Sequence, residues 1–240
     1  MKWGLASYTL REFNLEETIS MTKRIGIDNI SLKSMHLPYD LDSEEIKRRA
    51  QTVRDGDLNF YGVGVIYMGS KEEVDQGFNY GQDAGVDTII GAPNPEILEI
   101  AEDRVKEYDI KLAIHNHGPE SENYSGAKEI YEKIEGFDEK IGICLDIGHI
   151  KRIGRDPSKV MKKYSNRVLD IHIKDVSEAT EEGYTVPINQ GVIDIPGFLK
   201  TVQNCNYNGI LSIEFEEKSE DPMPEIAESI GFLKGATEVM

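Results

Sequence analysis

Histidines and acidic residues of this 240-residue chain fall directly after short apolar runs. His115 and His117 close the run that begins at Lys111, and they stand two residues apart. Residues at this spacing on a strand point to the same face of the sheet. Imidazole is a common metal ligand and a common general acid or base near neutral pH. The pair therefore marks a candidate site for metal binding or proton transfer.

Groups of the same kind close the apolar runs that follow. Asp146 ends a buried run, where a carboxylate is costly unless it binds something positive. His172 lies near the end of the next run, Glu214 ends the last one, and Lys174 shares the strand face of His172 by alternation. Such a mixture of imidazoles and carboxylates suits Zn²⁺, Mn²⁺, Co²⁺ or Fe²⁺. A lysine beside such a metal would stabilise an enolate or hold a substrate oxygen.

Eight apolar runs at a steady interval predict the strands that position these groups. They are residues 3–7, 29–32, 60–66, 88–90, 112–114, 141–145, 168–173 and 210–213. Several are continuously apolar, which is typical of strands buried on both faces of a parallel sheet. Helical patterns lie between them, and Asp42-x-x-Glu45 and Ser70-x-x-Glu73 predict capping boxes at two helix starts. Eight strands alternating with eight helices predict a single (β/α)₈ TIM barrel over residues 1–240.

Barrel enzymes carry their active-site groups at the C-terminal ends of the strands. All five histidines of this chain fall at such ends, and none falls in an expected helix. Any one of them could be an ordinary polar residue, but five at one end of a barrel argue for a site. The residues expected to line the substrate pocket by hydrogen bonds and aromatic faces are His36, His149, Lys33, Trp3 and Tyr8. The long polar connection 177–190 would form a lid or a subunit contact.

The charge of the chain excludes other classes of protein. There are 27 basic and 44 acidic residues, so the formal net charge is −17. This charge repels phosphate backbones and anionic membrane surfaces, so we expect neither a nucleic acid nor a membrane as a partner. No window approaches the ~20 apolar residues of a membrane span, and the first residues lack a signal-peptide pattern. We therefore expect a cytoplasmic protein with a small-molecule substrate, and a homo-oligomer stays open.

Four pieces of the chain together resemble the sugar phosphate isomerase/epimerase family, whose members are xylose isomerase-like barrels. The pieces are the H-x-H end of the fifth strand, Leu145-Asp146-x-x-His149, His172-x-x-Asp175, and the closing run from Gly191 to Glu216. The resemblance implies one divalent metal, with Mn²⁺, Zn²⁺, Co²⁺ and Mg²⁺ as candidates. It also implies metal ligands at Asp146, His172 and Glu214, and it matches His149 to a histidine that contacts substrate.

Position 115 departs from the pattern, because it is His where the resemblance asks for a ligand glutamate. In one reading, His115 replaces the glutamate as a ligand, since imidazole binds the same metals. In the other, the metal site is weak or empty and Glu120 or Glu122 compensates from the loop. Epimerases of the family use two facing metal-bound glutamates, and only Glu214 of that pair remains here. The resemblance matches His117 to a histidine of dehydratase members.

We expect a divalent-metal-assisted isomerase or epimerase that moves a proton next to a carbonyl of a sugar or sugar phosphate. Glu214 is the expected base, with His117 or Lys174 as the second acid or base. A lyase or dehydratase acting on a keto-sugar or inosose is the first alternative. A barrel that binds a sugar without turnover is the second. The expected metal ligands are His115, Asp146, His172 and Glu214.

Overall fold

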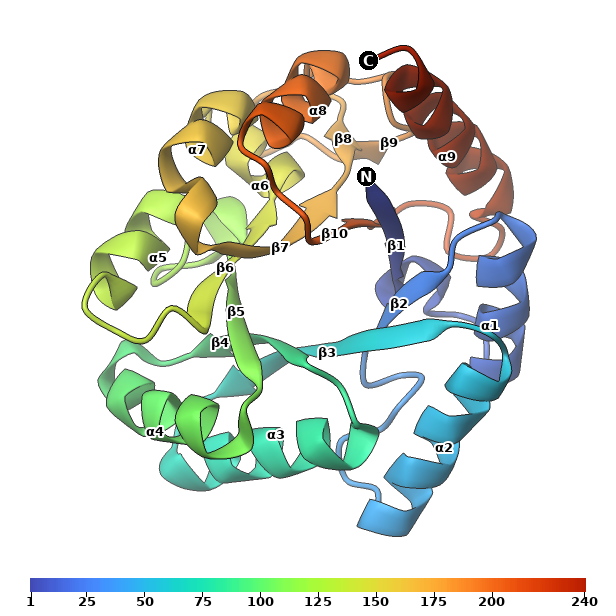
Figure 1. Ribbon diagram of the computed structural model, residues 1–240. Coiled ribbons are helices and arrows are strands. Elements are labelled where there is room, and N and C mark those ends of the chain that lie inside the picture. Colours follow the sequence, from blue (N-terminus) through green and yellow to red (C-terminus); the bar gives the residue numbers. More distant parts are fainter.

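The computed structural model describes residues 1–240 and shows a closed ring of strands surrounded by helices (Figure 1). The barrel strands are β1 (Lys2–Ala6), β2 (Asn29–Leu32), β3 (Asn59–Met68), β4 (Thr88–Pro93), β5 (Lys111–His115), β6 (Ile141–Asp146), β7 (Val168–Ile173) and β10 (Ile210–Ile213). Neighbouring strands are parallel, and β1 pairs with β10 to close the ring. The predicted (β/α)₈ TIM barrel is confirmed.

The helices lie around the outside of the ring (Figure 1). They are α1 (Leu15–Arg24), α2 (Ser43–Asp55), α3 (Lys71–Ala84), α4 (Leu98–Tyr108), α5 (Ala127–Ile134), α6 (Ile147–Arg152), α7 (Pro157–Tyr164), α8 (Ile195–Asn204) and α9 (Met223–Glu238). Short 3₁₀ turns are η1 (Ser7–Leu10), η2 (Pro95–Ile97), η3 (Gly118–Glu120) and η4 (Ser165–Arg167). We expected eight helices and the structure has nine, because the connection from β6 to β7 contains both α6 and α7. No helix has the length and apolar character needed to cross a membrane.

Side chains that accept backbone hydrogen bonds fix the helix starts. Ser70 and Glu73 form the predicted capping box at the start of α3. Asp42 accepts the backbone N–H of Glu45 at 2.9 Å, but the Glu45 side chain turns forward to Arg48. The predicted box at α2 is therefore only half formed, because an arginine one turn on offers the carboxylate a charged partner.

The interior of the ring contains a small apolar cluster separate from the main core. Its buried members are Ile90 on β4, Ala113 on β5 and Cys144 on β6. Ala113 and Cys144 stand two residues before His115 and Asp146, so alternation puts them on the same face of the sheet. The cluster therefore forms a layer directly beneath the polar groups at the strand ends.

A buried carboxylate organises the long connection after β7. Within it β8 (Asp175–Val176) and β9 (Thr185–Val186) pair as antiparallel strands. Asp175 is fully buried, and four backbone N–H groups donate to it at 2.9–3.1 Å. They belong to Val176, Asn189, Gly191 and Ile193. The segment expected as a lid or subunit contact is therefore tied down where it leaves β7 and where it approaches α8.

Replacing Asp175 by asparagine is expected to loosen this connection. The amide NH₂ group faces backbone donors and cannot accept, so at least one hydrogen bond to a charged group is lost, at a cost of about 1.5–3 kcal/mol. Urea unfolding measures the loss, and hydrogen exchange at the amides of Gly191 and Ile193 localises it. The exposed Asp221 accepts no such bonds, so Asp221→Asn is the control. Equal stability of the two variants would contradict this role of Asp175.

Candidate active site

Four side chains of ligand type converge where four neighbouring strands end. His115 closes β5, Asp146 closes β6, His172 lies one residue from the end of β7, and Glu214 follows β10. All four side chains are buried. One ligand atom of each lies within 4.8 Å of the ligand atoms of the other three. The alternation and the order of the strands predicted this convergence.

The separations within this set fit a shared metal ion. His115 Nε2 lies 3.1 Å from His172 Nδ1 and 3.6 Å from Asp146 Oδ2. His172 Nδ1 lies 3.1 Å from Glu214 Oε2 and 3.9 Å from Asp146 Oδ2. Ligand atoms placed about 2.1 Å from a tetrahedral ion stand about 3.4 Å apart. Of these converging atoms, Asp146 Oδ2 is buried without a well-aligned hydrogen-bond donor. The residues present therefore fit a divalent cation.

A buried lysine also balances the charge of the two carboxylates. Lys174 Nζ lies 2.9 Å from Asp146 Oδ2 and 2.9 Å from Glu214 Oε2, and it contacts Glu216. Burial alone would lower the pKa of Lys174, but these carboxylates hold it well above its usual range. Burial alone would raise the pKa of Asp146 and of Glu214, but Lys174 keeps both well below the usual range. Lys174 is therefore a fixed positive charge and hydrogen-bond donor, not a base.

The sequence motif D-x-x-H forms the start of a helix. Asp146 Oδ1 accepts the backbone N–H of His149 at 2.9 Å and caps α6, while Oδ2 faces His115 and Lys174. His149 therefore lies in a helix, which corrects the expectation that no histidine does. Asn116 braces the same place, because its side chain exchanges two 3.0 Å hydrogen bonds with the backbone of Asp146. Sequence reasoning missed Asn116, although its position between two candidate histidines was a signal.

A cavity of about 430 Å³ opens beside this set. Its lining includes six of the residues predicted from the sequence, which are Tyr8, Lys33, His115, His117, His149 and Glu214. It also includes residues that the sequence did not single out for the site, namely Ser34, Met35, Val65, Tyr67, Arg152 and Glu216. Asp146, His172 and Lys174 lie in the layer beneath the lining, where they are almost fully buried.

Two of the expected pocket residues lie elsewhere. His36 is buried, and its ring nitrogens lie 2.9 Å from Ser7 Oγ and 3.1 Å from the Leu10 carbonyl oxygen. It therefore ties the loop after β2 to η1 instead of facing the cavity. Trp3 lies near the N-terminal end of β1 and packs against the main core, whereas the cavity opens at the opposite ends of the strands.

His117 lies on the open side of the set, next to a tyrosine. Its ring centroid lies 4.3 Å from that of His115, and its ring stacks on Tyr67 at 5.7 Å with an interplanar angle of 26°. The Tyr67 hydroxyl lies 3.2 Å from His117 Nε2. Burial lowers the pKa of His117 to about 4, so the imidazole is neutral at neutral pH. Tyr67 stands beyond the apolar run 60–66 that predicted its strand, and this position concealed it.

Arg152 links three segments around the cavity. Its Nη2 donates to Glu120 Oε1 at 2.6 Å and to the Glu181 carbonyl oxygen at 2.5 Å. It thereby joins the loop after β5, helix α6 and the connection after β7. Glu120, considered above as a compensating metal ligand, is engaged by this arginine. Neither Glu120 nor Glu122 belongs to the converging set.

Comparison with known proteins agrees with this architecture. The family model described as xylose isomerase-like TIM barrel matches residues 96–236, more than half of the chain. The chain belongs to this family. The chain is similar to an inosose dehydratase of Clostridium perfringens, with 33% identity over 129 residues that cover 47% of this chain and 42% of that protein. The chain thus matches less than half the length of that relative.

Solved xylose isomerase-like barrels share the fold over nearly the whole chain. An L-ribulose 3-epimerase superposes with a TM-score of 0.80 at 19% identity, covering 100% of this chain and 95% of that one. The IolI protein, solved with a bound zinc atom, superposes with a TM-score of 0.82 at 17% identity and covers 98% of each chain. At these identities the likeness establishes the fold.

Replacing His115 by glutamine is expected to weaken binding of a divalent cation at least about tenfold, because a ligand nitrogen is lost from the set. Equilibrium dialysis with Zn²⁺ or Co²⁺, followed by elemental analysis, measures the bound metal per chain. His36→Gln is the matched control, since His36 is equally buried but lies outside the cavity. Equal metal binding by the two variants would refute the ligand role of His115.

Proposed function

We propose that this member of the xylose isomerase-like family removes a proton next to the carbonyl of a sugar-like polyhydroxy ketone and expels a hydroxyl as water. The observation that carries the proposal is the residue at position 115. Glu214 has an imidazole in place of the second facing carboxylate, so proton return by a paired glutamate has no residue to perform it. Loss of water needs one base, which this site retains.

Glu214 is the proposed base. Its Oε2 is engaged by Lys174 and His172, whereas Oε1 has no hydrogen-bond partner and lies 3.2 Å from Lys33 Nζ. The carboxylate is ionised, as a general base must be, and the same cations that keep it ionised lower its pKa and hence its basicity. The proton that it takes up and the departing hydroxide then combine as one molecule of water.

Lys174 and His117 have complementary proposed roles. The Lys174 ammonium is fixed by burial and ion pairing, and it supplies positive charge for an oxygen that becomes negative as the proton leaves. The neutral His117 ring lines the cavity and can hydrogen-bond the departing hydroxyl. A divalent cation on the four-residue set would polarise the substrate carbonyl and stabilise the enediolate.

The cavity favours an uncharged substrate over a sugar phosphate. Lys33, one of its two lining cations outside the buried layer, pairs with Glu214, and the other, Arg152, pairs with Glu120. A phosphate group would have to displace these carboxylates from their partners. The similarity to an inosose dehydratase supports a cyclic polyol ketone as the first substrate to test.

Isomerisation or epimerisation is the second candidate function. In this case His117, which is neutral and lines the same cavity as Glu214, would return the proton to the substrate. The product mass distinguishes the two reactions. Dehydration removes one water from the substrate, whereas isomerisation or epimerisation leaves its mass unchanged. Incubation with inososes and keto-sugars in D₂O, followed by mass spectrometry, separates loss of water from deuterium exchange at constant composition. Binding without either change would identify a non-catalytic barrel.

Replacing Glu214 by glutamine is expected to lower kcat/KM by about 10²–10⁴-fold, because the amide cannot accept the proton. Glu217, three residues further on, is exposed and lies outside the cavity lining, so Glu217→Gln should retain activity. Steady-state kinetics on the best substrate of the panel measure both variants. Wild-type turnover by Glu214→Gln would assign the base elsewhere.

Tyr67 is expected to act as a platform for the substrate ring. Its side chain is 68% exposed at the cavity and stacks on His117. Tyr67→Ala should raise KM about 2- to 10-fold, because an aromatic contact of about 0.5–1.5 kcal/mol is lost. Tyr184 is 58% exposed but lies outside this cavity, so Tyr184→Ala is the control and should leave KM unchanged. Equal KM values would exclude the platform.

A further inference from the structure

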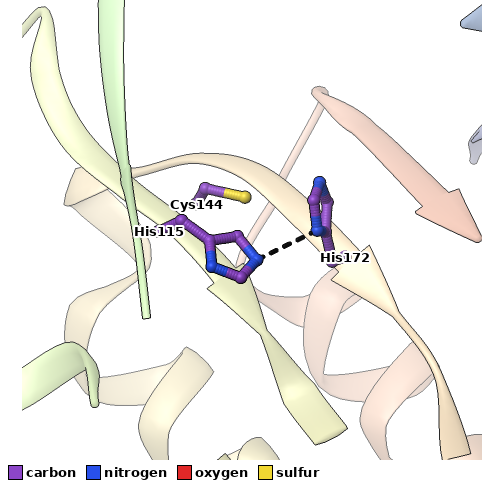
Figure 2. Close-up of side chains that lie close together, drawn as sticks. All are labelled: His115, Cys144 and His172. Atoms are coloured by element: carbon purple, nitrogen blue, oxygen red, sulfur yellow. Dashed lines mark hydrogen bonds between the residues drawn. The ribbon is translucent and has the colours of Figure 1, made fainter. Parts of the chain in front are cut away.

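A buried thiol lies beside the two imidazoles of the candidate metal site. Ligand atoms of His115, Cys144 and His172 all lie within 4.8 Å of one another, and all three residues are buried. Figure 2 shows the Cys144 sulfur directed toward the two rings, which face each other across the 3.1 Å contact between their nitrogens. Because Cys144 stands two residues before Asp146 on β6, its thiol lies one layer further into the barrel.

Ammonium groups face the carboxylates of this region, and one imidazole nitrogen has no partner. Asp146 and Glu214 each have the Lys174 ammonium at 2.9 Å. His172 Nε2, in contrast, is completely buried without a hydrogen-bond partner, and its nearest carboxylate oxygen is Asp170 Oδ2 at 3.7 Å. A buried polar atom without a partner is costly. His172 Nε2 is therefore open to a ligand, as are Asp146 Oδ2 and Glu214 Oε1, which also lack hydrogen-bond partners.

A proton acceptor for the thiol is already in place. The Cys144 thiol donates a weak hydrogen bond to Asp170 Oδ2 at 3.7 Å. Asp170 is itself buried and accepts the Tyr61 hydroxyl at 3.3 Å. A thiol loses its proton when it coordinates a metal. Here that proton can pass to the Asp170 carboxylate without leaving the barrel, while the sulfur lone pair forms the bond to the metal.

The buried charges also admit one divalent cation. Four carboxylates gather around the set, from Asp146, Asp170, Glu214 and Glu216. Two ammonium groups, those of Lys33 and Lys174, face them. With both imidazoles neutral, as metal-ligating imidazoles are, the cluster carries two excess negative charges. One divalent cation neutralises them, and transfer of the thiol proton to Asp170 leaves this balance unchanged.

We propose that His115, Cys144 and His172 form a nitrogen and sulfur site for a borderline or soft divalent cation such as Zn²⁺, Co²⁺ or Cd²⁺. The site rests on the metal centre of the proposed function, because it shares both imidazoles with the carboxylate set. Because the imidazoles are shared, only one ion can occupy the two ligand sets at a time. Thiolate ligands select against Mn²⁺ and Mg²⁺, so the chain should prefer the softer metals.

Titration of the full-length protein with Co²⁺ tests the proposal directly. Bound Co²⁺ should show the near-ultraviolet charge-transfer band of a thiolate ligand in addition to its visible ligand-field bands. The band should disappear in Cys144→Ser and persist in Cys205→Ser, because Cys205 is the other cysteine of the chain and lies at the end of α8. Zn²⁺ affinity of Cys144→Ser should fall at least about tenfold, with Mn²⁺ affinity unchanged.

The wild-type spectrum decides the question even if Cys144→Ser does not fold. Ligand-field bands without a thiolate band would overturn the proposal and leave the carboxylate metal site of the proposed function intact. A thiolate band that is lost in Cys205→Ser and kept in Cys144→Ser would show that Cys205 binds the metal. This result would also overturn the proposal. Absence of any Co²⁺ binding would reject both the thiolate site and the metal centre on which the proposed function relies.

Discussion

The arrangement at the barrel mouth depends on one interaction, the Lys174 ammonium held between Asp146 and Glu214. An isolated charge at this depth would be very costly, so the lysine and the carboxylates must be buried together. The pairing fixes each group in its ionised form. It also links the ends of β6, β7 and β10. The ion pairs that stabilise these strand ends therefore also hold the side chains of the candidate site in place.

The parallel barrel makes such a cluster available from short sequence signals. Each strand ends at the same edge of the ring, and residues two apart share a face. The same rule layers the interior, with Ala113 below His115 and Cys144 below Asp146. Ala113 and Cys144 are small, so the side chains of His115 and Asp146 can pack above them in the barrel interior. Asp146 then connects the layers to α6, since one of its oxygens caps that helix.

The fold and the converging set were predictable because both follow from local rules. Apolar runs marked the strands, and alternation placed His115, His172 and Lys174 on the interior face. Long-range contacts were not visible in the same way. His36 does not face the cavity, because its two ring nitrogens hydrogen-bond to the Ser7 hydroxyl and to the Leu10 carbonyl oxygen. Both partners are far from His36 in the sequence. Arg152 was missed for a related reason, because its partners lie on other loops.

The histidine at position 115 and the lysine at position 174 are best understood together. A glutamate at 115 would add another buried negative charge to a cluster that already holds Asp146, Glu214 and Glu216 around one ammonium. A neutral imidazole keeps a ligand nitrogen and removes that charge, so Lys174, together with Lys33 on Glu214, can balance the remaining carboxylates. The same change replaces a hard oxygen donor by nitrogen beside Cys144, which moves the ligand set toward softer metals. In the proposed reaction and the proposed metal site, the residue at position 115 thus determines both the number of available bases and the metal preference.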